Sequence, residues 1–241
     1  MLLSLCLIAF FVASAQKPEQ ETVAFNNKKG WGIYAIVRPM WYNQTALNQR
    51  LNAANLPEVS KFNWQLGLGI SYLFETGTEL GLDVTSSSQN KNSNQSSLTA
   101  MPLAYDFVVR QNLASIARDF HLYAMAGGFG FEQLISIERQ SPAVNQFQQA
   151  LLTSNVSRIS LATEGFVFGF GLKNIDLDKK QNHLAEYWAL EIGYRLQLGK
   201  TWWSNTFYDI SNGPEADVRQ FYLSMKFGAF LKAKQKSKKE R

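Results

Sequence analysis

The residues best suited to acid–base chemistry are the two histidines of the chain, His121 and His183. An enzyme that trims or acylates lipids needs such a base beside an activated hydroxyl. No serine of the sequence has the glycine-flanked setting of a nucleophile elbow. The sole cysteine, Cys6, lies in an N-terminal apolar run that we expect to be removed. The sequence therefore predicts ordinary polar roles for both histidines and no catalytic residue.

Motifs for metals and phosphates are equally poor. Asp176 and Asp178 alternate oxygen ligands, but the glycine and distal glutamate of an EF-hand do not follow them. A polar turn is the simpler interpretation.

The run Gly127-Gly128-Phe129-Gly130 lacks the spacing and the lysine of a phosphate loop. Strand glycines that face the lumen and make space there for large neighbours explain it better. We expect neither a metal nor a cofactor.

The elements that would position polar side chains are β-strands, because apolar residues recur at every second position. In residues 62–74 the even-numbered positions are aromatic or aliphatic, and the odd-numbered ones are mostly polar or glycine. Residues 188–198 and 221–229 repeat this alternation. Five weaker segments, near 30–42, 77–86, 98–110, 120–132 and 158–173, bring the expected number of strands to about eight.

The connections between these strands alternate in length, at about 19, 2, 11, 9, 25, 10 and 18 residues. Outer-membrane barrels have short periplasmic turns, long outer loops and periplasmic termini. The sequence therefore predicts an all-β fold, a transmembrane antiparallel β-barrel of about eight strands in an up-and-down meander. Outer loops are expected near 43–61, 87–97, 133–157 and 199–216, and both termini are expected in the periplasm. A soluble lipocalin-like barrel, with its apolar residues turned inward, is the structural alternative.

Composition and the chain ends agree with an exported barrel. The mean hydropathy of −0.19 looks soluble, and no apolar run of 18 residues follows residue 15, which excludes ordinary transmembrane helices. Residues 1–15 form an expected signal peptide, with Ala13 and Ala15 as the small residues before cleavage. An N-terminal anchor is the alternative. Residues 16–29 would be a periplasmic segment, 30–231 the barrel and 232–241 a basic tail that contributes much of the net charge of +5.

The chain resembles the small outer-membrane β-barrel family common in the Bacteroidetes lineage, which includes the PorT-like proteins. The segments that support this resemblance are Gly30-Trp31-Gly32, Met101 to Tyr105, Tyr123 to Gly128, Gly169-Phe170-Gly171 and Glu191 to Arg195. The last strand, with Phe221, Phe227 and Phe230, is similar to the aromatic-ended strand that barrel-insertion machinery reads. The resemblance implies a location and a fold but no catalytic residue.

Charged residues at the inward positions of such a barrel require partners, because side chains fill the interior of eight strands. We therefore expect a lumenal network of ion pairs rather than a conduction path. Its expected members are Arg38, Asp83, Asp106, Arg110, Glu191, Arg195 and Lys226.

The function predicted is a non-enzymatic outer-membrane protein with a structural or interaction role in the cell envelope. The resemblance implies, more specifically, an accessory of a type 9 secretion-like export assembly. The alternatives are a lipid-modifying barrel enzyme, a small-solute channel and a soluble lipocalin-like binding barrel. Expected partners are outer-membrane lipid, the barrel-insertion machinery and envelope or secretion-complex proteins. The basic tail is either solvated or in contact with an acidic periplasmic partner, and nucleic acid is not expected.

Overall fold

The computed structural model describes residues 29–93, 96–117, 119–139, 156–175, 184–205, 210, 213–214 and 220–233. The expected signal peptide with Ala13 and Ala15, the residues Asp176, Asp178 and His183, and the tail from residue 234 lie outside these ranges. Within them the elements are β1 Gly30–Trp41, α2 Thr45–Ala53, β2 Phe62–Leu73, β3 Thr78–Ser86, β4 Gln89–Asn92, β5 Ser96–Ala117, β6 Phe120–Arg139, β7 Val156–Ile175, β8 Leu184–Asn205 and β9 Gln220–Lys232.

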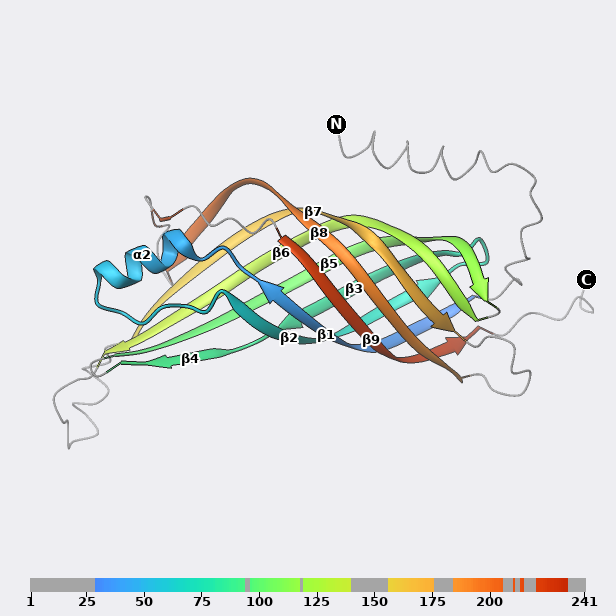
Figure 1. The fold of residues 1–241 in the computed structure, drawn as a ribbon, viewed down its shortest axis with the longest axis horizontal. Coiled ribbons are helices and arrows are strands. Elements are labelled where there is room, and N and C mark those ends of the chain that lie inside the picture. The colour runs from blue at the N-terminus through green and yellow to red at the C-terminus, as the bar shows by residue number, and fades with distance from the viewer. Residues whose placement is uncertain are drawn as a thin grey trace, which may run out of the picture.

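The strands close into a ring in which every neighbouring pair is antiparallel. Their order is β3-β2-β1-β9-β8-β7-β6-β5, and a direct pairing of β3 with β5 completes the circle. The short β4 only extends the sheet beside β5, so the closed barrel has eight strands. Figure 1 shows these strands running obliquely along the length of the molecule. The predicted eight-stranded antiparallel meander is confirmed.

The two faces of the barrel have the polarity of a membrane protein. Outward side chains in the middle of the strands are apolar and exposed, as in Leu66 at 63%, Leu68 at 69% and Ile192 at 58%. Inward side chains of the same strands include charged groups that are almost wholly buried, such as Arg38 and Glu191. A soluble lipocalin-like barrel would have the reverse arrangement, so the structure excludes that alternative. In the described part of the chain, no helix has the length and hydropathy needed to cross a membrane.

Strands of unequal length make one end of the barrel project. β5 and β8 each have 22 residues and β6 and β7 have 20, whereas β1 and β2 have 12 and β3 has 9. The outward face of the long strands becomes polar toward this end, first at Glu132 and Glu164 and then at Glu138 and Arg158, all of which are exposed. The apolar band of the barrel ends shortly past Glu132 and Glu164, at the outward residues Met101, Leu134 and Trp202, and the last parts of β5–β8 extend past it.

Residues 42–60, which we call the cap, cover the inner face of this projection. Leu47 and Leu51 of α2 and Val59 belong to one apolar cluster with Ile135, Ile137 and other residues of the long strands. Asn48 closes the cap on itself, because its Nδ2 donates to the Val59 carbonyl and its Oδ1 accepts from the Val59 N–H, both at 2.9 Å. Figure 1 shows α2 at one end of the molecule, above the far ends of the long strands. We call this the cap end.

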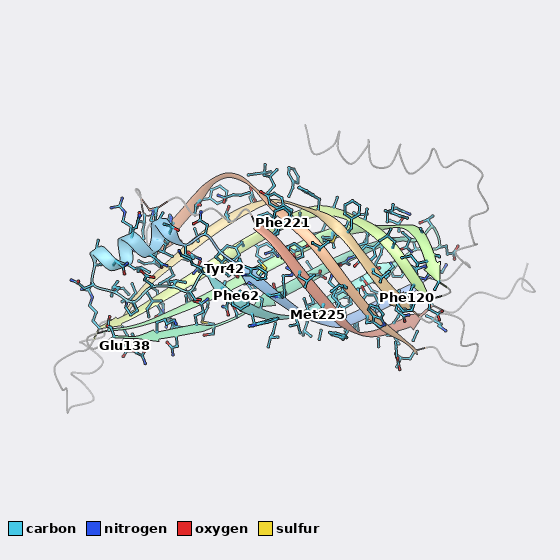
Figure 2. All side chains as sticks on the ribbon, viewed as in Figure 1. Tyr42, Phe62, Phe120, Glu138, Phe221 and Met225 are labelled. Carbon is cyan, nitrogen blue, oxygen red and sulfur yellow. The ribbon has the colours of Figure 1, made fainter. Side chains whose placement is uncertain are left out.

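The opposite end, which we call the turn end, holds the short connections. β2 and β3 are joined there by residues 74–77, and β5 and β6 by residues 118–119. The first and last strands also meet there, since Gly30 of β1 pairs with Lys232 of β9. In Figure 2, Phe120 lies at this end and Glu138 at the cap end.

Three predicted loops contain regular structure that the sequence analysis missed. Residues 43–61 hold α2, residues 87–97 hold β4 and the start of β5, and β6 continues through residue 139. Outward positions such as Ser97, Ser136 and Glu138 are polar in these extensions, so the alternation of apolar residues is weak there. β8 likewise continues to Asn205, because Gly199, with a φ of +79°, begins a bulge rather than a loop. At the other end of the barrel, β5 runs to Ala117, which shortens a connection expected to have about nine residues.

Candidate functional site

The lumen is the place where the structure concentrates polar chemistry. It brings together the seven charged residues predicted to face inward, and each is no more than 2% exposed. They come from β1, β3, β5, β8 and β9, whose alternate residues point into the barrel. The seven residues are Arg38, Asp83, Asp106, Arg110, Glu191, Arg195 and Lys226.

Arg110 of β5 is the centre of the network. Its Nε donates to Glu191 Oε1 at 2.9 Å and its Nη2 to Asp83 Oδ2 at 2.9 Å. Its Nη1 donates to Glu79 Oε1 at 3.2 Å. A Cβ at position 81 would overlap the guanidinium of Arg110, so only glycine leaves room for it. One guanidinium thus joins three carboxylates from two other strands, and its Nε, Nη1 and Nη2 all donate hydrogen bonds.

Lys226 and two tyrosines complete the connections around these carboxylates. Lys226 Nζ donates to Asp83 Oδ2 at 2.6 Å and to Glu191 Oε1 at 2.8 Å. Tyr34 Oη donates to Asp83 Oδ1 at 2.7 Å, and Tyr123 Oη donates to Glu191 Oε1 at 2.8 Å. Asp83 and Glu191 therefore each have charged and neutral donors at once, which is the arrangement that makes a buried carboxylate tolerable.

A second group lies nearer the cap end and is built around Asp106 of β5. Arg38 Nη1 donates to Asp106 Oδ2 at 2.6 Å, and Arg195 Nη2 donates to Oδ1 at 2.7 Å and to Oδ2 at 2.8 Å. The guanidinium carbons of Arg38 and Arg195 lie 4.4 and 5.3 Å from the centre of the Tyr222 ring. Arg195 also lies 5.4 Å from the centre of the Phe129 ring.

A further buried ion pair, outside the predicted network, joins Lys173 Nζ to Glu79 Oε2 at 2.6 Å. Both are buried at inward positions, Glu79 near the start of β3 and Lys173 near the end of β7. Glu79 is four residues before Asp83 in the same strand, so the alternation of faces predicts that both side chains point inward. Glu79 was not predicted because it lies near the start of β3, where the bounds of a strand are uncertain in the sequence. Tyr34 and Tyr123 were also missed, because a tyrosine in an alternating strand does not reveal which face it occupies.

Glycines shape both faces of the wall. A Cβ at Gly69 would overlap the Tyr34 ring, one at Gly171 the Tyr123 ring and one at Gly193 the Tyr222 ring. In the run from Gly127 to Gly130, the space serves the opposite face, because the ring that a Cβ at Gly130 would meet is that of Tyr105, which is 48% exposed. Gly130 thus makes space for a large neighbour as predicted, but the prediction that this space faces the lumen was wrong, because Tyr105 lies on the outward face.

His121 is the described histidine, and it contacts Ser115 with 3.0 Å between Nδ1 and Oγ. The two residues are register partners of β5 and β6 near the turn end. A lipid-modifying enzyme needs such a base beside an activated hydroxyl, and this pair lies at the turn end, opposite the cap. Within the described ranges, no three side chains of His, Cys, Asp or Glu are grouped to hold a metal ion.

The aromatic residues expected to mark the last strand occupy different faces. Phe221 and Phe227 are outward, with 70% and 54% exposure. Phe230 is buried in an apolar cluster with Tyr34, Leu73 and Tyr187. Phe230 faces inward because position 230 has the same parity in β9 as the inward residues Tyr222 and Lys226.

A closed antiparallel barrel with an apolar outer band and a charged, filled interior defines an outer-membrane-type β-barrel protein. No protein-family model matches the sequence, and no curated protein matches it.

Two solved structures have a similar arrangement of strands. A major outer membrane protein from Thermus thermophilus matches with a TM-score of 0.43 and 8% identity, covering 84% of this chain and 99% of that chain. The outer membrane protein OprG from Pseudomonas aeruginosa matches with a TM-score of 0.41 and 13% identity, covering 88% of this chain and 99% of that chain.

Proposed function

We propose that the chain is a non-enzymatic protein of the bacterial outer membrane with a structural or interaction role in the cell envelope. The observation that carries the proposal is the polarity of the barrel. Leu68 is 69% exposed on its outside while Arg38, Arg110 and Arg195 are buried inside. A side chain such as Leu68 is stable at the surface of a barrel when lipid surrounds it. Outer-membrane lipid is therefore the partner of the apolar band.

The lumenal network supports a structural role for the interior. Its carboxylates are already held by arginine and lysine side chains from other strands, as in the contacts of Arg110 with Glu79, Asp83 and Glu191. A group that accepts a substrate or passes an ion along a pore has to be free to exchange partners. The interior of eight strands is also about filled by side chains. These features favour a rigid scaffold over a channel.

The cap is the part of the molecule suited to meet other molecules of the envelope. It lies past the apolar band, and Gln49 and Arg50 of α2 are exposed on it. We place the cap outside the cell and the turn end in the periplasm, because outer-membrane barrels have long connections outside and short ones inside. Gly30 and Lys232 at the turn end would then put both termini in the periplasm.

Participation in a type 9 secretion-like assembly is the narrower form of this proposal, and it rests on the sequence resemblance alone. It predicts that envelope proteins copurify with the chain and that its deletion reduces secretion. A lipid-modifying enzyme would instead change the lipid profile of the envelope on deletion.

The test of location is migration on a detergent gel, boiled against unboiled, for protein recovered from fractionated envelopes. We expect the protein in the outer-membrane fraction with a shift on boiling, because a closed barrel resists detergent until heat unfolds it. An unshifted band in the soluble periplasmic fraction would contradict the proposal.

A matched pair of variants, Gln49→Cys in the cap and Thr76→Cys at the turn end, tests the orientation of the barrel in the membrane. An impermeant maleimide should label only the first on intact cells.

A further inference from the structure

The buried charges of the lumen do not balance among the residues that the structure describes. Nine charged side chains are buried there. Five of them are cations and four are carboxylates. The cations are Arg38, Arg110, Lys173, Arg195 and Lys226, and the carboxylates are Glu79, Asp83, Asp106 and Glu191. A buried charge without a counter-charge is costly enough that proteins pair it or change its ionisation, and arginine does not lose its proton.

The excess charge lies at the cap end of the network. Toward the turn end, Arg110, Lys173 and Lys226 face an equal number of carboxylates within direct contact. Toward the cap end, Arg38 and Arg195 share the single carboxylate of Asp106. The next carboxylate, Asp83, has its Oδ2 3.9 Å from Arg38 Nη2 and is already held by Arg110 and Lys226. One positive charge therefore belongs to the Arg38–Arg195 pair.

The same two arginines carry buried N–H groups without acceptors in the described part of the chain. These are Nε and Nη2 of Arg38 and Nε and Nη1 of Arg195. Both guanidiniums lie over the Tyr222 ring, which attracts a cation through the ring face. Such a contact leaves the N–H groups in the guanidinium plane unbonded. Both the missing charge and the missing acceptors thus occur at one place, and one anion would supply both.

We propose that Arg38 and Arg195 hold a small monovalent inorganic anion of the halide class, on the side of the pair not used by Asp106. A water molecule satisfies the N–H groups but leaves the charge uncompensated. The pair lies on the inward face below Met40 and Tyr42, which belong to the apolar cluster beneath the cap. This setting selects a small ion over a larger organic anion. The anion would compensate the charge of Arg38 and Arg195 and accept hydrogen bonds from them, as the carboxylates do for the other cations of the network.

The experiment uses the full chain refolded in detergent and transferred to sodium gluconate. Bromide or chloride then replaces gluconate at constant ionic strength, and the midpoint of thermal unfolding is followed by the gel shift. We expect the midpoint to rise by several degrees and to saturate, because a ligand bound only by the folded state stabilises it. In Arg195→Gln, where the remaining Arg38–Asp106 pair is neutral, the halide effect should disappear. Arg158→Gln, on the outward face of β7, should retain it.

A second measurement on the unchanged chain does not depend on any variant folding. Crystals grown in bromide should show an anomalous scattering peak within hydrogen-bond distance of both guanidiniums. Two results would overturn the proposal: only water at this position in bromide, or a midpoint that responds to halide no more than to gluconate. An equal response in the wild type and in Arg195→Gln would overturn it as well, because the effect would then be one of the bulk salt.

Discussion

Arg110 Nε donates to Glu191 Oε1 at 2.9 Å and so joins β5 to β8, two strands separated by β6 and β7 on one side of the ring. The residues are 81 positions apart in the chain. Hydrogen bonds of the wall connect only neighbouring strands, whereas this contact spans the interior. Together with Lys226, which reaches both Asp83 and Glu191, it holds the barrel at a fixed cross-section.

Glu191→Gln should lower the free energy of unfolding by about 3–5 kcal/mol, the usual cost of removing one partner from a buried ion pair. The substitution leaves Arg110 and Lys226 with one counter-charge fewer. The measurement is equilibrium unfolding in urea of the refolded protein. Glu186→Gln, at an exposed position of the same strand, is the control and should change stability by less than about 0.5 kcal/mol. Equal effects of the two substitutions would show that the network contributes little.

Lys173 and Glu79 should be energetically coupled, because Lys173 Nζ donates to Glu79 Oε2 at 2.6 Å. In a double-mutant cycle with Lys173→Met and Glu79→Gln, the first variant leaves Glu79 Oε2 without its donor, although Oε1 still accepts from Arg110, and the second leaves Lys173 without its counter-charge. The double variant should therefore cost less than the sum of the two, with a coupling energy of about 0.5–3 kcal/mol. Strict additivity would mean that the two side chains do not interact in the folded protein.

Leu68→Arg should destabilise the barrel in lipid by about 2–4 kcal/mol, the cost of an arginine on the lipid face near the midplane of a membrane. Leu68 is outward and 69% exposed. Glu138→Arg places the same side chain on the outward face of β6 past the apolar band, and it should be nearly neutral. Unfolding in vesicles measures both variants. A Leu68→Arg barrel as stable as the wild type would contradict the assignment of this band to lipid.

Leu51→Ala should loosen the cap without opening the barrel. Leu51 is 6% exposed in the apolar cluster, and truncation of a buried leucine costs about 2–5 kcal/mol. Leu51 packs α2 on the barrel through this cluster and belongs to no strand of the ring, so the loss should appear as local unfolding of the cap. We expect faster trypsin cleavage after Arg50 or Lys61 while the gel shift of the barrel is retained. Gln49→Ala, on the exposed side of α2, should cleave at the wild-type rate.

The wild-type protein should be silent in planar bilayers, because its lumen is filled by paired side chains. The cap-end pair Arg38 and Arg195 on Asp106 and the hub at Arg110 together occupy the interior. The measurement is current across a bilayer at high salt, with a porin inserted in parallel as the positive control. Reproducible conductance steps from correctly folded protein would favour the small-solute channel instead.

The alternation of apolar residues was enough to predict the number of strands, their approximate bounds and the inward face of Arg38 or Glu191. It worked because a barrel wall obeys a period of two over its whole length. It failed where the wall leaves the apolar band. In the last part of β6 the inward residues Ile135 and Ile137 remain apolar, but the outward residues Ser136 and Glu138 are polar. Which charges pair could not be predicted, since Arg110 and Glu191 meet only when the ring is closed.

The pairing of Gly30 with Lys232 has a consequence for how the protein assembles. β1 pairs with β2 on one edge, but its other edge remains unpaired until β9 is in place. Nearly the whole barrel sequence separates β1 from β9. Until then, β1 and the growing end of the sheet are unpaired edges able to associate with other chains. Closing so long a loop makes the final step slow relative to the formation of the hairpins that precede it. The period of greatest exposure to aggregation thus falls between the formation of β1 and the arrival of β9, when both edges of the growing sheet are open.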